Sequence, residues 1–172
     1  MKLSSNQRRY LLFGYCLIPF VINFLLNGII GLVTFRGINP VPTWGMVSSA
    51  GPDLIGTCFF LPAITCLIVT PLVRRHIRRG AVERTSGSEC LPSWLRPFQR
   101  PLAARAVLFG LAGLGLIGSL ATAALLAAAP TQFGLTPFVW LKASFSAVLG
   151  GAVTPIIGLV ALAETEPERQ TA

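Results

Sequence analysis

Four polar side chains interrupt long apolar stretches of this sequence. Asn23 and Asn27 stand four residues apart inside "PFVINFLLNGIIGLVTFRG", and Thr65 and Lys142 lie in two further apolar stretches. A carboxamide or an ammonium group loses its hydration when hydrocarbon surrounds it, so it needs a protein partner or a wet cavity. These four residues are therefore candidates for hydrogen bonds between helices or for the lining of a transport path.

A second candidate site is a group of charges. Arg36, Asp53 and Lys142 each stand near one end of an apolar stretch, and we expect these ends to lie on the same side of the fold. The three residues could form a charge cluster that binds a ligand. The alternative, which we favour, is that the Lys142 side chain extends its ammonium group to the nearby surface, as long charged side chains do near helix ends.

The remaining sequence shows no pattern that predicts catalysis. It has no nucleophile next to a base, no phosphate-binding loop and no paired carboxylates. His76 is the only histidine, which excludes a haem held by two histidines and argues against a metal site. We therefore expect a protein that is not an enzyme and that uses no cofactor and no metal.

The apolar stretches predict helices that cross a membrane. The chain has 172 residues, of which 53% are hydrophobic and only 12% are charged. Charged side chains are absent from residues 10–35, 54–73, 106–141 and 143–163. A helix needs roughly 20 residues to cross about 30 Å of hydrocarbon, so each stretch is long enough. The third is too long for one helix, and Pro130, Gly134 and Pro137 predict a turn that ends it.

The sequence thus predicts an all-α fold, an integral membrane four-helix bundle that forms one domain over residues 1–172. We expect the spans near residues 11–35, 54–73, 106–129 and 138–163. Lys2, Arg8 and Arg9 precede the first span as they would precede a signal peptide. The apolar part of a signal peptide is only about 7–15 residues long, so the first span is expected to be an uncleaved anchor.

The distribution of cations predicts the orientation. Residues 74–105 contain eight arginines and the N-terminal arm contains three cations, whereas residues 36–53 contain one and residues 130–136 contain none. Cytoplasmic loops of membrane proteins retain Lys and Arg. We therefore expect the inner membrane of a bacterial cell, both termini in the cytoplasm, a basic cytoplasmic loop at 74–105 and a cytoplasmic tail at 164–172.

The same distribution explains the formal net charge of +8 without a nucleic-acid partner. The expected partner is the lipid bilayer, because cations near an anionic leaflet add about 1 kcal/mol each to lipid association. Trp94, Leu95, Phe98 and Leu102 suit a segment in the headgroup layer, and Pro101 is expected to open the third span. The expected contacts with anionic lipids are Arg74, Arg75, Arg78, Arg79, Arg96 and Arg100.

Each expected span carries one stripe of small or polar residues at a spacing of four. Residues at this spacing share one side of a helix, and such stripes are typical of helices that pack together in lipid. We expect the asparagines to form hydrogen bonds across the helix interface of the first span. The four stripes are Tyr15, Pro19, Asn23, Asn27 and Gly31; Cys58, Pro62, Cys66 and Thr70; Gly115, Ser119, Ala123 and Ala127; and Lys142, Ser146, Gly150, Thr154 and Gly158.

In size and number of spans the chain resembles the disulfide-generating quinone oxidoreductases of the bacterial inner membrane. Those enzymes need cysteine pairs in their outer loops, but Cys16, Cys58 and Cys66 lie within spans and Cys90 lies in the central loop. Small proton-coupled exporters use a carboxylate deep in the membrane, but no Asp or Glu is expected at that depth in this chain. The leading expectation is therefore a non-catalytic component that packs against itself or another membrane protein. The alternative is a small oligomeric permease or channel.

Overall fold

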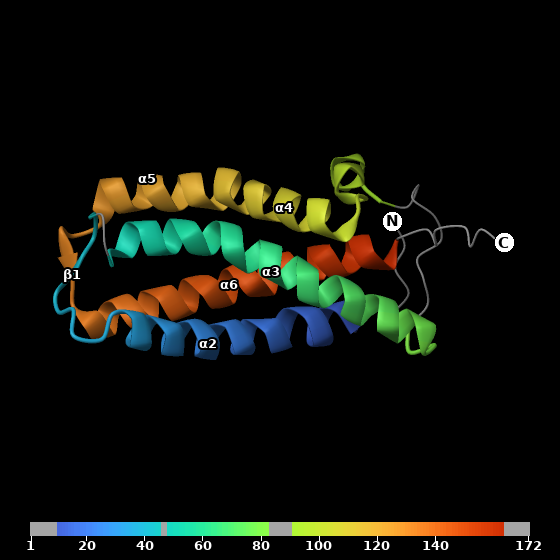
Figure 1. Ribbon diagram of the computed structural model, residues 1–172, viewed down its shortest axis with the longest axis horizontal. Helices are drawn as coiled ribbons and strands as arrows, with labels where there is room; N and C mark the ends of the chain where they lie inside the picture. Colours follow the sequence, from blue (N-terminus) through green and yellow to red (C-terminus); the bar gives the residue numbers. More distant parts are fainter. Residues whose placement is uncertain (1–9, 46–47, 83–90, 164–172) are drawn as a thin grey trace.

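A computed structural model describes residues 10–45, 48–82 and 91–163, and it is an elongated bundle of helices (Figure 1). Within the described residues, four helices are long and apolar enough to cross a membrane. They confirm the four long apolar helices that the sequence predicts. Their bounds are Gly14–Thr34, Ala50–Arg78, Leu102–Ala128 and Leu135–Leu162.

The first helical stretch begins as a π-helix, η1 (Tyr10–Leu17), and continues as α2 (Ile18–Thr34). The change of winding lies next to Pro19, which has no N–H to donate to the preceding turn. Gly37 follows α2 with a φ of 84°, a backbone conformation that glycine adopts without a steric penalty. The chain therefore turns sharply after α2.

The second helix is longer at both ends than the charge-free stretch suggests. It is α3 (Ala50–Arg78), which begins before residue 54 and continues past residue 73. As a result Asp53 lies in its first turn, and Arg74, Arg75 and Arg78 lie in its last two turns. Acidic residues are favourable in the first turn of a helix and basic ones in the last, because of the helix dipole.

The third and fourth helical stretches differ in regularity. The third consists of α4 (Leu102–Gly113), a π-helical segment η4 (Leu114–Gly118) and α5 (Ser119–Ala128). The fourth is one unbroken helix, α6 (Leu135–Leu162). As expected, Pro101 stands directly before the first residue of α4.

The last helix in the sequence, α6, is the most buried of the four long helices. Both α2 and α3 pack against α6, while α4 and η4 pack against α3 (Figure 1). In its most apolar part, α6 has 61% of its residues buried, whereas the first helical stretch has only 6% buried in its own most apolar part. Large apolar side chains on α2, such as Leu25 and Val33, remain exposed, as they would on a helix that faces lipid.

One end of the bundle, which we call the strand end, is closed by two paired connections. The strand β1 (Val41–Pro42) pairs with the antiparallel strand β2 (Gln132–Phe133). Thr43 donates hydrogen bonds from its backbone N–H to the carbonyl of Thr131 and from its hydroxyl to the carbonyl of Pro130. Below the strands lies a cluster of buried apolar residues, Phe35, Val41, Ala50, Leu54, Leu125 and Phe138.

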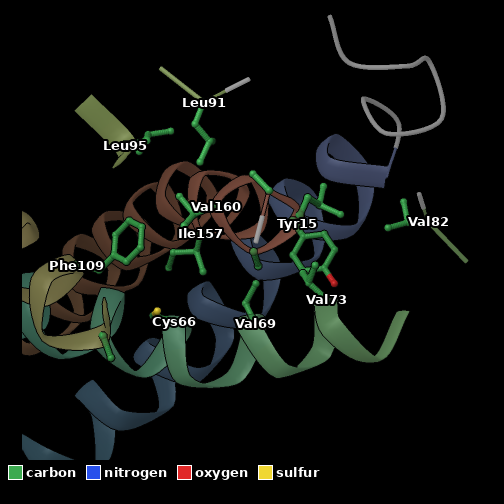
Figure 2. Packing of buried hydrophobic residues seen from close by; sticks show 14 residues of the cluster. Tyr15, Cys66, Val69, Val73, Val82, Leu91, Leu95, Phe109, Ile157 and Val160 are labelled. Carbon is green, nitrogen blue, oxygen red and sulfur yellow. The ribbon is translucent and has the colours of Figure 1, made fainter. Parts of the chain in front are cut away.

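The opposite end, which we call the arginine end, has a larger apolar core. Figure 2 shows Tyr15, Val73, Phe109 and Ile157 converging there from four different helical segments. The described start of the chain and the end of α6 both lie at this end (Figure 1). The short helix η3 (Ser93–Phe98) also packs here, ahead of α4.

The position of η3 corrects the expectation that Leu95 and Phe98 face the headgroup layer. Leu95 is only 1% exposed because it packs into the core of the bundle, and the Phe98 ring lies 4.3 Å from that of Phe109 between centroids. The buried Arg105 donates hydrogen bonds to the carbonyls of Phe98 (2.8 Å) and Arg100 (3.0 Å). The segment is therefore held against the helices, and Trp94 is its exposed apolar residue.

Candidate functional site

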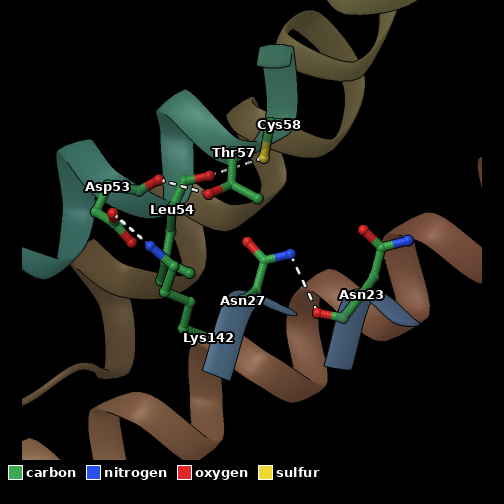
Figure 3. A network of polar contacts seen from close by, with 7 residues as sticks. All are labelled: Asn23, Asn27, Asp53, Leu54, Thr57, Cys58 and Lys142. Atoms are coloured by element: carbon green, nitrogen blue, oxygen red, sulfur yellow. Dashed lines mark hydrogen bonds and ion pairs between the residues drawn. The ribbon is translucent and has the colours of Figure 1, made fainter. Parts of the chain in front are cut away.

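The most unusual polar contact in the described residues is an ion pair between two helices. Nζ of Lys142, in the second turn of α6, lies 2.6 Å from Oδ1 of Asp53, in the first turn of α3 (Figure 3). Lys142 is 3% exposed and Asp53 is 20% exposed. The expectation that Lys142 extends to the surface was wrong, because the earlier start of α3 brings a carboxylate within its reach.

A glycine on α2 makes room for the lysine. A Cβ atom at Gly31 would lie 3.4 Å from Cδ of Lys142, which is closer than most such contacts. The alkyl chain of Lys142 therefore crosses the α2 backbone before its ammonium group reaches α3. Three helices thus meet at this one side chain.

Two buried polar atoms next to the pair lack a hydrogen-bond partner among the described residues. They are the second carboxylate oxygen of Asp53 and the hydroxyl of Ser146. Ser146 lies one turn after Lys142 on α6 and is completely buried. Buried polar groups normally have hydrogen-bond partners, so these two atoms mark a polar region in which hydrogen-bonding capacity remains unused.

Asn23 and Asn27 lie on the side of α2 that faces the bundle, and both are half-buried. Their amide nitrogens, however, donate to carbonyls of their own helix. Nδ2 of Asn23 lies 2.8 Å from the carbonyl oxygen of Pro19. Nδ2 of Asn27 lies 3.1 Å from the carbonyl oxygen of Asn23, as Figure 3 shows. These bonds lie within α2 and do not join it to another helix.

The contact of Asn23 with α6 is one of close packing. A Cβ atom at Gly150 would lie 2.8 Å from Cγ of Asn23 and nearer still to its amide nitrogen. The carboxamide therefore occupies the space that a side chain at position 150 would need. The close approach of α2 and α6 therefore depends on two glycines, Gly31 of α2 beside Lys142 and Gly150 of α6 beside Asn23.

The structure does not bring every candidate residue to this site. Thr65 is half-buried on α3, and its position in the helix places it about 18 Å along the axis from Asp53. Arg36 is exposed in the turn after α2, and no ion pair joins it to another described residue. The expected cluster of three charges is therefore a pair.

The arginines expected to contact anionic lipids all lie at the arginine end. Arg74 is half-buried, whereas Arg75, Arg78 and Arg79 are exposed on or directly after the last turn of α3. Arg96 and Arg100 are exposed on and after η3. Arg105 is the arginine whose role the sequence did not suggest, and its place just before an apolar stretch was its only signal.

The stripes of the second and fourth spans are buried, as expected, but that of the third is not. Gly115, Ser119, Ala123 and Ala127 are all exposed. The residues of this span that approach α3 are Gly110 and Gly113 instead. A Cβ atom at Gly110 would lie 2.8 Å from the Phe59 ring, and one at Gly113 would lie 2.9 Å from the Pro62 ring.

This span has small residues on two sides of the helix. The four-residue row is on the side away from α3, whereas Gly110, Gly113 and Gly118 lie on the side toward it. Before the π-helical segment η4, the buried positions are Arg105, Ala106, Phe109, Gly110 and Gly113; Gly118 is buried within η4, and Leu125 is buried after it. In a regular α-helix, residues 117 and 124 would continue the buried side of α4, in place of residues 118 and 125. A π-turn holds one more residue than an α-turn, so it rotates everything after it by about 100°.

Among residues 10–45, 48–82 and 91–163, no three His, Cys, Asp or Glu side chains come together in a way that could hold a metal ion. Comparison with protein-family models, with curated proteins and with solved structures found no match. The functional proposals below therefore rest on the geometry of the bundle.

Proposed function

We propose that this protein is a multi-pass component of a bacterial inner membrane, with both termini in the cytoplasm, and that its role is non-catalytic. It associates with a second copy of itself through the exposed small residues of the third span, which we call the association face: Gly115, Ser119, Ala123 and Ala127. The observation that carries this proposal is that the other three stripes are turned into the bundle while this one is turned outward.

The association face is hollowed. A groove of about 520 Å³ runs between this span and the start of α3, with Ile55 and Leu126 among its walls. The hydroxyl of Ser119 donates to the carbonyl of Gly115 at 2.6 Å, and that of Thr122 donates to the carbonyl of Gly118 at 2.8 Å. Another helix could cover this surface without leaving these hydroxyls unpaired.

A second copy is the occupant that this surface suits best. Small residues at a spacing of four let two helix backbones approach closely, and van der Waals packing then holds the helices together in lipid. The same row on a second copy offers the same small residues, so one face is sufficient for a symmetric dimer. The third span has surface to spare, since only 17% of the residues in its most apolar part are buried.

The experiment compares two neighbouring alanines. Ala123→Leu should fill the groove and weaken association about tenfold, which corresponds to about 1.4 kcal/mol. Ala124→Leu is the matched control, because Ala124 is exposed but does not line the groove. Single-molecule photobleaching in liposomes at several protein densities measures the dimer fraction. A wild-type chain that remains monomeric at all densities would contradict self-association.

A second function, that of a small oligomeric permease or channel, is favoured by a different observation. Charged residues inside membrane spans are costly and commonly mark transport paths. Here the Lys142 and Asp53 pair lies between three helices, and the second carboxylate oxygen of Asp53 has no hydrogen-bond partner in the described chain. In this alternative Asn23, Asn27, Thr65 and Lys142 would line the path. Ion flux into liposomes that contain the purified protein would support it.

A further inference from the structure

A second groove lies between α2 and α6. In Figure 1, α2 lies on the opposite side of the bundle from α5, which carries most of the association face. Its volume is about 320 Å³. Ile29 and Leu32 of α2 form one wall, and Trp140 of α6 forms the other, with its ring centroid 5.6 Å from that of Phe24. Thr136, in the first turn of α6, is its one polar lining residue.

The groove points toward a cation at the strand end. Ile29, Leu32 and Arg36 follow one another at spacings of three and four, so they share one face of the helix. The helical path continues past the end of α2, because the backbone N–H of Arg36 still donates to the carbonyl of Val33 at 3.4 Å. Arg36 follows the last residue of α2 by two positions, so its long side chain can reach the strand end of the groove, where Leu32 lies.

Arg36 is also free to bind an anion. It is exposed, and no carboxylate among the described residues pairs with it. The other cation near this end, Lys142, is buried and paired with Asp53. The groove thus has an apolar body with the Thr136 hydroxyl in its lining, and the unpaired guanidinium group of Arg36 can reach its strand end.

We propose that this groove binds one glycerophospholipid, with an acyl chain between α2 and α6 and the phosphate on Arg36 and Thr136. A guanidinium group donates two parallel hydrogen bonds to phosphate oxygens, and a hydroxyl can donate a third. The chain alone gives little selectivity, because lipid tails are as apolar as the groove. The headgroup contact therefore selects the lipid, and anionic headgroups are preferred because a zwitterionic one carries a competing cation.

This inference rests on the proposed membrane location but not on self-association. Native mass spectrometry of the full-length protein, released from detergent micelles after incubation with lipid, tests it directly. We expect one phosphatidylglycerol to be retained per chain, with phosphatidylcholine retained less and diacylglycerol, which has no phosphate, lost. Arg36→Gln should lower the retained phosphatidylglycerol at least fivefold, and Arg36→Lys should restore part of it.

The groove is tested by a matched pair of substitutions. Leu32→Trp should fill the groove and displace the lipid, whereas Val33→Trp, at an exposed neighbour that does not line it, should not. Equal loss in both variants, unchanged retention in Arg36→Gln, or equal retention of diacylglycerol would each overturn the proposal. The same spectra report the mass of the protein, so a monomer that retains the lipid contradicts only the proposed association.

Discussion

Nζ of Lys142 and Oδ1 of Asp53 lie 2.6 Å apart, although 89 residues separate them in the sequence. This contact joins α6 to α3 at a place where the Lys142 side chain also passes α2 at Gly31. A charge buried without its partner is strongly unfavourable, so the two residues depend on each other.

The first prediction concerns this ion pair. Lys142→Met should lower the free energy of unfolding by about 3 kcal/mol, because it leaves the Asp53 carboxylate without its cation. Unfolding in mixed micelles with increasing denaturing detergent measures the change. The double variant Lys142→Met with Asp53→Leu should recover a large part of the loss. If the single and double variants are equally unstable, the pair is not coupled as described.

The second prediction concerns the contact of Asn23 with Gly150. Gly150→Ala should destabilise the protein by about 1–3 kcal/mol, because the new methyl group has no room beside the carboxamide. Gly56→Ala is the control, since a Cβ atom there meets no atom within 4 Å. Adding Asn23→Ala to Gly150→Ala should restore stability. No rescue would mean that the strain lies elsewhere.

The third prediction concerns Arg105. Arg105→Met should release η3 from the bundle, because two carbonyls lose a charged donor, at a cost of about 2–3 kcal/mol. A cysteine at Ser93 should then react faster with a water-soluble maleimide than it does in the parent protein. Arg96→Met, at an exposed arginine of η3, should leave the reaction rate unchanged. Equal rates in both variants would show that Arg105 does not hold this segment.

The fourth prediction separates the two proposed functions. If the protein is a non-catalytic component, liposomes that contain it should show no more proton or ion flux than empty liposomes. In the alternative, wild-type protein conducts, and Asn27→Leu abolishes the flux while the protein remains folded. Circular dichroism of the same samples establishes the folded state. Flux that persists in Asn27→Leu would exclude this residue from a path.

The fifth prediction concerns orientation. Reporter fusions at residue 88 should report the cytoplasm, and fusions at residues 45 and 133 should report the outside. The reason is the contrast between eight arginines in residues 74–105 and one in residues 36–53. A translocated fusion at residue 88 would reverse the proposed arrangement of every helix.

The four long helices could be predicted because the absence of charge over a stretch of sequence is a local property. The ends of α3 could not be predicted in this way. Asp53 and Arg74 bound its charge-free stretch, yet both are helical, since a charged residue suits the end of a helix. The ion pair could not be predicted for the same reason. Asp53 was expected outside the second span, but it lies in the first turn of α3, within reach of Lys142.

The outward face of the third span could not be predicted for a different reason. Small residues occur on more than one side of this span, so a spacing of four among them does not identify the side that packs against α3. The π-turn at Leu114–Gly118 changes the winding once, and no proline or charged residue in that segment indicates it.

The packing of both α2 and α3 against α6 affects how the protein is made. A ribosome completes α6 last, yet α2 and α3 both pack against it. In the proposed membrane location, the first and second spans therefore enter the bilayer before the helix against which both pack, and Asp53 enters before its cation. A nascent chain that ends before residue 135 cannot complete the bundle, and we expect membrane proteases to recognise it as unassembled until Lys142 has entered.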